Sequence, residues 1–253
     1  MHMTRTMLLI CPLIFAAGLV DSIAGGGGLI SLPAYVFAGL PMHFAYGTNK
    51  FSSMFGTLFS TLRFVKSRKV YLKSAIISAI GALAGSALGA KAALSLSDIY
   101  LRYTLIIMLP VIAVFILAKR NFGENNRVKH LSGRKIIFLS AITGVVIGAY
   151  DGFFGPGTGT FLILVYTGAI GFDMTTASGN SKIVNLSSNI AALVTFLLSG
   201  KVLFGIGIPA ALFGIAGNWI GSGLAIKNGS KVIKPVFIGV FALLFLKIVT
   251  EFI

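Results

Sequence analysis

Two aspartates stand at matching places in this chain, each four residues before a glycine-rich run. Asp21 precedes Gly25-Gly26-Gly27-Gly28, and Asp151 precedes Gly155-Pro156-Gly157-Thr158-Gly159. Such a run ends a helix and leaves backbone N–H groups free at the start of the next helix, where the helix dipole also favours negative charge. The predicted chemistry is therefore the binding of an anion. The aspartates could relay a proton, bind a coupling cation, pair with a lysine or cap the helix break, and these roles stay open.

Each glycine run is followed by a long segment with a lysine near its start and polar residues at every fourth position. Lys50 and Lys182 lie three residues before Ser53 and Asn185, so each lysine shares the polar face of its helix. Polar faces are costly in lipid and normally line the bundle interior or a pathway. Each lysine is expected either to attract an anion or to extend its ammonium group to the membrane interface. The two polar stripes are Asn49, Ser53, Thr57 and Ser181, Asn185, Asn189.

These patterns give a set of candidate site residues. The coupling candidates are Asp21 and Asp151. No metal site or cofactor is expected, because the single cysteine and the three histidines form no spaced ligand set. No nucleotide-binding loop and no hydrolase or zinc-protease motif is present, so an intramembrane enzyme is the weaker alternative. The candidate substrate-binding residues are Gly25, Gly26, Gly27, Gly28, Asn49, Lys50, Gly155, Gly157, Thr158, Thr160, Asn180, Lys182 and Asn185.

The matching positions belong to an internal duplication. At one constant offset Gly18 and Asp21 align with Gly148 and Asp151, and after a two-residue insertion Lys50 aligns with Lys182. The same register continues to Gly85 and Gly89, which align with Gly217 and Gly221. Paired broken helices in corresponding halves are the best sequence indicator of a transporter's substrate site. The predicted organisation is a first membrane repeat over 1–118, a basic linker over 119–134 and a second repeat over 135–253.

The composition is that of an integral membrane protein. Apolar residues make up 56% of the chain and charged residues 11%, and the mean hydropathy is +0.95, whereas soluble domains are about a quarter charged. The net charge of +15 arises mainly because acids are scarce, and the basic residues cluster between apolar segments. This pattern marks cytoplasmic loops, here 63–73 and 119–135, of a multi-pass protein of the inner (plasma) membrane. No soluble basic module is present to bind nucleic acid.

The elements that must position these residues are all expected to be helices, about eight of them transmembrane. The row Gly81, Gly85 and Gly89 predicts close packing of one helix on another. The piece after the first glycine run, 29–40, would be only about 18 Å long as a helix, short of the roughly 30 Å of hydrocarbon in a bilayer. Two arrangements remain open: glycine-broken or re-entrant helices with about four spans per half and parallel halves, or five spans per half and inverted halves.

The glycine and lysine motifs resemble the sulfite exporter TauE/SafE family of membrane transporters. The resemblance covers nearly the whole chain and depends on D-S-I-A-G-G-G-G with G-T-N-K in the first half. In the second half it depends on G-F-F-G-P-G-T-G-T with A-S-G-N-S-K-x-x-N, the more distinctive motif. The resemblance implies about eight helices in two homologous halves that carry sulfite, sulfonates or related organic acids.

The resulting hypothesis is a secondary transporter whose partners are a small anionic substrate, the lipid bilayer, and a proton or sodium ion for coupling. The alternative from the same class is a carrier or channel for another small solute. The scarcity of membrane acids, only six Asp and Glu in the whole chain, disfavours a cation as that solute. The oligomeric state, the direction of transport and the identity of the anion stay open.

Overall fold

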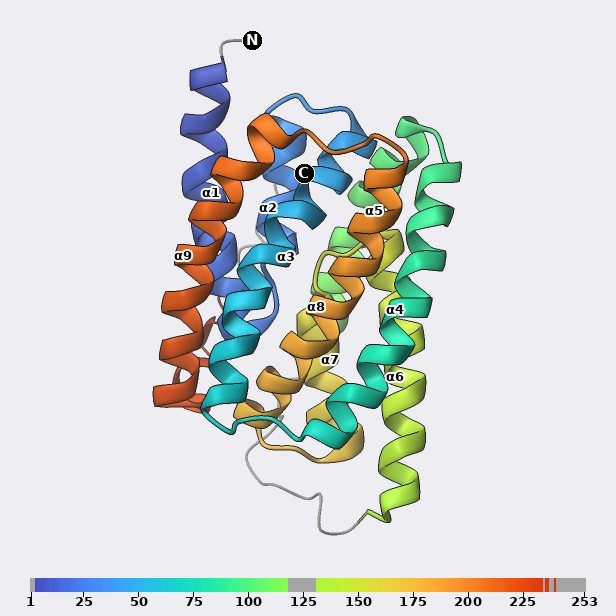
Figure 1. Ribbon diagram of the computed structural model, residues 1–253, viewed down its shortest axis with the longest axis vertical. Coiled ribbons are helices and arrows are strands. Elements are labelled where there is room, and N and C mark those ends of the chain that lie inside the picture. Colours follow the sequence, from blue (N-terminus) through green and yellow to red (C-terminus); the bar gives the residue numbers. More distant parts are fainter. Residues whose placement is uncertain (1–2, 118–130, 234, 237–238, 240–253) are drawn as a thin grey trace.

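The computed structural model describes residues 3–117, 131–233, 235–236 and 239, and the regular elements of this part of the chain are helices (Figure 1). The predicted all-α class is therefore confirmed. Most of the predicted linker 119–134 and the end of the second half lie outside the described residues. The helices are α1 Met3–Ala24, α2 Gly28–Phe37, α3 Met42–Lys66, α4 Leu72–Ser95, α5 Asp98–Leu117, α6 Gly133–Phe153, α7 Thr158–Val165 with a π-helical turn Tyr166–Ile170, α8 Met174–Leu198 and α9 Phe204–Asn228.

Five helices of the described chain, α1, α4, α6, α8 and α9, are long and apolar enough to cross a membrane. Their large apolar side chains point outward, as Ile80 and Leu212 do, while hydroxyl groups such as that of Ser86 are fully buried. This inverted pattern is what a lipid environment selects, because only the protein interior offers hydrogen-bond partners. The protein is a multi-pass membrane protein, and the count of about eight spans stays a prediction.

Six long helices form two groups of three that run in opposite directions. In Figure 1, α1, α3 and α9 descend, and α4, α6 and α8 ascend. A Cβ atom on Gly179, near the start of α8, would lie 2.0 Å from the carbonyl oxygen of Lys69, just after α3 ends. Likewise a Cβ atom on Gly47, near the start of α3, would lie 2.1 Å from the carbonyl oxygen of Lys201, just after α8 ends. The two central helices α3 and α8 are therefore antiparallel.

Glycines hold the helices of each group in close contact. A Cβ atom on Gly85 of α4 would lie 2.3 Å from the carbonyl oxygen of Val145 in α6. At the aligned position, a Cβ atom on Gly217 of α9 would lie 2.1 Å from the carbonyl oxygen of Phe15 in α1. The predicted packing role of the glycine row in α4 is confirmed, since any larger residue would push the neighbouring helix away.

The two short helices turn back after the glycine breaks. Helix α2 has 10 residues and α7 has 8, too few to cross a bilayer. Both α1 and α3 begin at the upper end of Figure 1, and both α6 and α8 begin at the lower end. Helices α1 and α2 therefore form a first hairpin that enters from above, and α6 and α7 form a second hairpin from below. The two hairpins therefore point in opposite directions, and the re-entrant and inverted arrangements of the membrane spans stay predictions.

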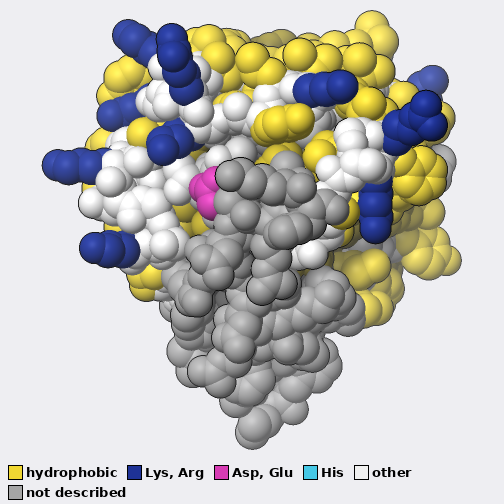
Figure 2. Space-filling model, turned by 90° about the horizontal axis from the view of Figure 1, so that it is seen from below, with side chains coloured by type: hydrophobic (Ala, Val, Ile, Leu, Met, Phe, Trp, Pro, Cys, Tyr) yellow, Lys and Arg dark blue, Asp and Glu magenta, His cyan; other side chains and the backbone are white. Residues whose placement is uncertain are grey.

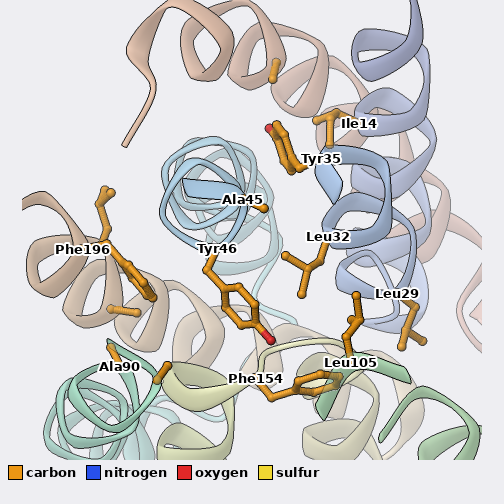
Figure 3. Packing of buried hydrophobic residues seen from close by; sticks show 14 of the residues in the cluster. Ile14, Leu29, Leu32, Tyr35, Ala45, Tyr46, Ala90, Leu105, Phe154 and Phe196 are labelled. Carbon is orange, nitrogen blue, oxygen red and sulfur yellow. The ribbon is translucent and has the colours of Figure 1, made fainter. Parts of the chain in front are cut away.

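An aromatic and aliphatic core joins the hairpins to the central helices (Figure 3). Tyr46 of α3 is fully buried and stacks on Phe196 of α8, with ring centroids 6.4 Å apart. Leu32 and Tyr35 of α2 and Phe154 at the end of α6 lie in the same cluster. This packing holds α2 and the end of α6 against α3 and α8.

The lower end of the molecule is strongly basic. Figure 2, seen from below, shows Lys and Arg side chains around its rim. The ends of α3 and α9 and the starts of α4, α6 and α8 meet there, and the predicted basic loop 63–73 belongs to this end. The described basic residues of these segments are Arg63, Lys66, Arg68, Lys69, Lys73, Arg134, Lys135, Lys227 and Lys231.

Candidate substrate site

The tips of the two hairpins meet at the centre of the bundle. The hydroxyl group of Thr160 donates a hydrogen bond to the carbonyl oxygen of Ala24 at 2.9 Å, and its backbone N–H donates to the carbonyl oxygen of Gly25 at 3.2 Å. Gly25 has φ +77°, and a Cβ atom there would lie 2.1 Å from the backbone of Gly159. Only glycine satisfies both the backbone angle and the contact, so the tips are locked backbone to backbone.

Free amide groups surround this contact, as the glycine runs predict. The chain leaves α1 at Ala24, and α2 begins at Gly28. Within the described residues, the backbone N–H groups of Gly27, Gly28 and Gly159 have no hydrogen-bond partner. Unpaired donors at a helix start carry partial positive charge and bind anions. The glycine breaks therefore provide free N–H donors for an anion without any change in the structure of the protein.

Two buried ion pairs connect opposite halves of the chain. Lys50 Nζ of α3 lies 2.7 Å from Asp151 Oδ2 of the second hairpin. Lys182 Nζ of α8 lies 2.8 Å from Asp21 Oδ2 of the first hairpin, and it also donates to the main-chain oxygen of Asp21. Of the alternatives for the aspartates, the structure shows pairing with the lysines. Neither lysine reaches the interface, since their side chains are only 3% and 0% exposed.

A central cavity lies beside the hairpin tips and the ion pairs. Measured as space open to the centre of a water molecule, its volume is about 40 Å³, where one water needs on the order of 10–15 Å³. Polar atoms and glycine backbone form most of its wall. The lining residues are Ile14, Ala17, Gly18, Asp21, Gly25, Gly27, Gly28, Ser31, Asn49, Lys50, Ser52, Ser53, Thr57, Asp151, Gly155, Thr158, Gly159, Asn185, Asn189, Gly214 and Asn218.

Two buried polar atoms in this wall lack a partner among the described residues. They are the hydroxyl oxygen of Ser31 in α2 and Oδ1 of Asn218 in α9, and each residue is 3% exposed. Buried polar atoms are rarely left unpaired, so the cavity wall is built to meet polar contents. Sequence analysis missed both residues. Asn218, an amide within an apolar, glycine-containing helix, carried a usable signal, because such residues mark functional sites in membranes.

Most of the residues that the sequence singled out line the cavity, and five of the candidates do not. Gly26 and Gly157 lie in the turns between the helices of each hairpin. Thr160 joins the tips, and Lys182 lies behind Asp21. Asn180 accepts a hydrogen bond from the backbone N–H of Tyr71 at 2.8 Å, where α4 begins.

The contact of Asn180 has a counterpart at the aligned position. Thr48 accepts a hydrogen bond from the backbone N–H of Leu203 at 3.1 Å, where α9 begins. Both side chains satisfy a backbone donor at the start of a long helix, where intrahelical partners are absent. Asn180 and Thr48 therefore connect α8 to α4 and α3 to α9 at the two ends of the molecule, away from the cavity.

A bundle of membrane helices with two broken hairpins, free amides and paired charges around a central polar cavity has the construction of a membrane transporter. The chain belongs to the sulfite exporter TauE/SafE family, which residues 10–248 match.

Relatives agree with this class. The chain is 36% identical over 238 residues to "Probable membrane transporter protein ORF9" of Sinorhizobium sp, covering 94% of this chain and 90% of the relative. It is 33% identical over 235 residues to "Probable membrane transporter protein YfcA" of Escherichia coli strain K12, covering 93% and 86%. A "Probable membrane transporter protein" of Haemophilus influenzae is 33% identical over 224 residues, covering 88% and 87%. No solved structure matches the chain.

Proposed function

We propose that this protein is a secondary transporter that moves a small anion, namely sulfite, a sulfonate or a related sulfur-containing oxyanion or organic acid, across the inner (plasma) membrane. The observation that carries the proposal is the position of Lys50, which lines the central cavity together with Gly27 and Gly28, whose amide groups are free. An ammonium group and converging amides form a site for a compact anion. The sulfur chemistry is supported by the description of the family.

The cavity sets limits on the substrate. Its volume of about 40 Å³ suits a small ion and excludes a lipid or a nucleotide. The carboxylates of Asp21 and Asp151 are each neutralised by a lysine. The cavity wall therefore has no unpaired negative charge that could bind a cation. Charged groups inside a membrane protein mark the pathway of the transported ion. A carrier of a neutral solute is the nearest alternative, and it would not require Lys50.

The basic lower end supports one orientation of the protein in the membrane. Lysine and arginine accumulate on the cytoplasmic side of membrane proteins. In the proposed orientation the start of α4 and the end of α9 face the cytoplasm, and the second hairpin enters the membrane from that side. The driving force is an ion gradient, because the sequence carries no nucleotide-binding motif.

The test is uptake of labelled sulfite, sulfate and methanesulfonate by proteoliposomes that contain the purified protein. Lys50→Ala is expected to abolish uptake, whereas Lys91→Ala, at an exposed lysine of α4, should leave it at the wild-type rate. A wild-type protein that moves none of these anions in either direction would contradict the proposal. Equal uptake by wild type and Lys50→Ala would remove Lys50 from the site and leave anion transport standing.

A further inference from the structure

We propose that Asp151 couples transport to protons: the anion binds Lys50 only when Asp151 carries a proton, so one proton crosses with each anion. The inference depends on the proposed function and adds the coupling ion. It is carried by the geometry of the pair, in which Lys50 Nζ is 2.7 Å from Asp151 Oδ2 and both side chains are 3% exposed.

An anion and Asp151 compete for the same ammonium group. Lys50 and Asp151 both line the cavity, and a Cβ atom on Gly155 would lie 3.3 Å from Lys50 Nζ and 3.5 Å from Asp151 Oδ1. An anion that approaches Lys50 therefore meets a carboxylate at close range. Two negative charges in such a buried place repel each other strongly, because water does not screen them. A proton on Asp151 removes this repulsion.

Charge balance then allows the transporter to change conformation in only two states of the site, the empty state and the loaded state. The empty site holds Lys50 and ionised Asp151, and the loaded site holds Lys50, a monovalent anion and neutral Asp151. Both sums are zero. An anion bound without the proton leaves one negative charge inside the membrane, and the proton without an anion leaves one positive charge. Uncompensated charge in the membrane interior is costly, so neither ion should leak alone.

The second ion pair, Lys182 with Asp21, is held differently, and its two charges stay paired throughout transport. Lys182 is 0% exposed and donates to both a carboxylate oxygen and the main-chain oxygen of Asp21. Lys182 is absent from the cavity wall, whereas Lys50 is part of it. Lys50 has its single described hydrogen-bond acceptor in Asp151. The Lys50 pair is therefore the one that a ligand in the cavity can open.

The other titratable groups around the cavity are few. Asp21 of α1 faces it and is paired with Lys182 of α8. Tyr150 of α6 stands next to Asp151 and donates to the carbonyl oxygen of Pro156, and Tyr35 of α2 is 2.8 Å from the hydroxyl of Ser52 in the wall. In the described chain, α7, α8 and α9 line the cavity with no titratable side chain. Asp151 is thus the acid whose protonation changes the partner of Lys50.

The experiment uses the full chain in proteoliposomes that enclose a pH-sensitive dye. The probe is methanesulfonate, whose charge is fixed across the neutral range, so the proton cannot travel on the substrate. Addition of external methanesulfonate is expected to acidify the lumen by one proton per anion taken up. A membrane potential imposed with potassium and valinomycin should leave the rate unchanged, because the loaded site is neutral.

Asp151→Asn supplies the decisive variant, since its carboxamide resembles a protonated acid. Exchange of labelled for unlabelled methanesulfonate is expected to persist, because the loaded site is still neutral. Net uptake should fall severalfold and lose its proton movement, because the empty site now keeps one positive charge. Asp98→Asn is the matched control, since Asp98 pairs with His43 at the upper end of the molecule; it should behave as wild type.

The outcomes separate this inference from the proposed function. Anion uptake without proton movement in the wild type would overturn the coupling and leave anion transport standing. Proton-coupled net uptake by Asp151→Asn would also overturn it. If this variant does not fold, the wild-type proton-to-anion ratio decides alone. Failure of the wild type to move methanesulfonate or sulfite would contradict both proposals.

Discussion

Lys50 and Asp151 form an ion pair at 2.7 Å although 101 positions separate them in the chain. One residue lies on the central helix α3 and the other on the second hairpin, so the pair connects the two halves across the cavity. The aligned residues Lys182 and Asp21 connect them in the opposite sense. The halves are thus joined by two crossed bonds, and each hairpin is tied to the central helix of the other half.

Removal of one partner of the Lys50 pair is expected to destabilise the protein. Lys50→Met or Asp151→Leu alone leaves an unpaired buried charge, which costs about 3–5 kcal/mol. The double variant Lys50→Met/Asp151→Leu removes both charges and should be close to wild type in stability. Thermal unfolding in detergent, followed by the fluorescence of the single tryptophan, Trp219, measures this cycle.

The matched control for this cycle is Lys91→Met, at an exposed lysine, which should leave the unfolding temperature unchanged. Additive losses in the double variant would show that the two side chains do not interact in solution.

The contact between the hairpin tips predicts a strong effect of a single methyl group. Gly25→Ala places a Cβ atom 2.1 Å from the backbone of Gly159 at φ +77°, with a cost of about 1–2 kcal/mol for the backbone and about 1–3 kcal/mol for the overlap. Gly133→Ala is the control, because nothing lies within 4 Å of a Cβ atom there. We expect reduced yield and a lower unfolding temperature for Gly25→Ala only. Wild-type behaviour of Gly25→Ala would mean that the tips are apart in the membrane.

The sequence predicted the breaks because a break is a local property. Glycine runs between apolar segments end helices whatever surrounds them, and α1 and α6 end within a few residues of those runs. The polar stripe of α3 was also readable, because a helix repeats its faces at a fixed period. Asn49 and Lys50 line the cavity as that period requires.

The partners of these residues could not be read in the same way. Which aspartate meets Lys50 depends on the antiparallel arrangement of α3 and α8, which no local pattern encodes. Asn180 directly precedes Ser181, the first residue of the polar stripe, and its amide serves the start of α4 rather than the cavity. Ser31 looked like an ordinary small residue of a short helix, and only the fold brings it into the cavity wall.

Asn180 and Asn185 should therefore respond differently to substitution. Asn180→Ala leaves the N–H of Tyr71 without its acceptor and should cost about 1–3 kcal/mol of stability with an unchanged KM for the anion. Asn185→Ala changes the cavity wall and should raise KM roughly three- to tenfold, the loss of one hydrogen bond. Both are measured as initial uptake rates and unfolding temperatures. A raised KM in Asn180→Ala alone would contradict the placement of these residues.

Asn218 gives the most direct test of the cavity itself. Its amide nitrogen donates to the carbonyl oxygen of Gly214 at 3.0 Å, and its Oδ1 has no partner among the described residues. Asn218→Leu nearly keeps the size of the side chain and removes an unpaired buried acceptor, so stability should change by less than about 1 kcal/mol or increase.

Anion uptake by Asn218→Leu should nevertheless fall, because an apolar group replaces a polar one in the cavity wall. Ser222→Ala, one turn further along α9, is the control, since Ser222 is buried and bonds to the carbonyl oxygen of Trp219 outside the cavity wall. Uptake by Ser222→Ala should equal that of wild type. If Asn218→Leu transports normally, the unpaired oxygen faces only water, and the anion passes on the Lys50 side of the cavity.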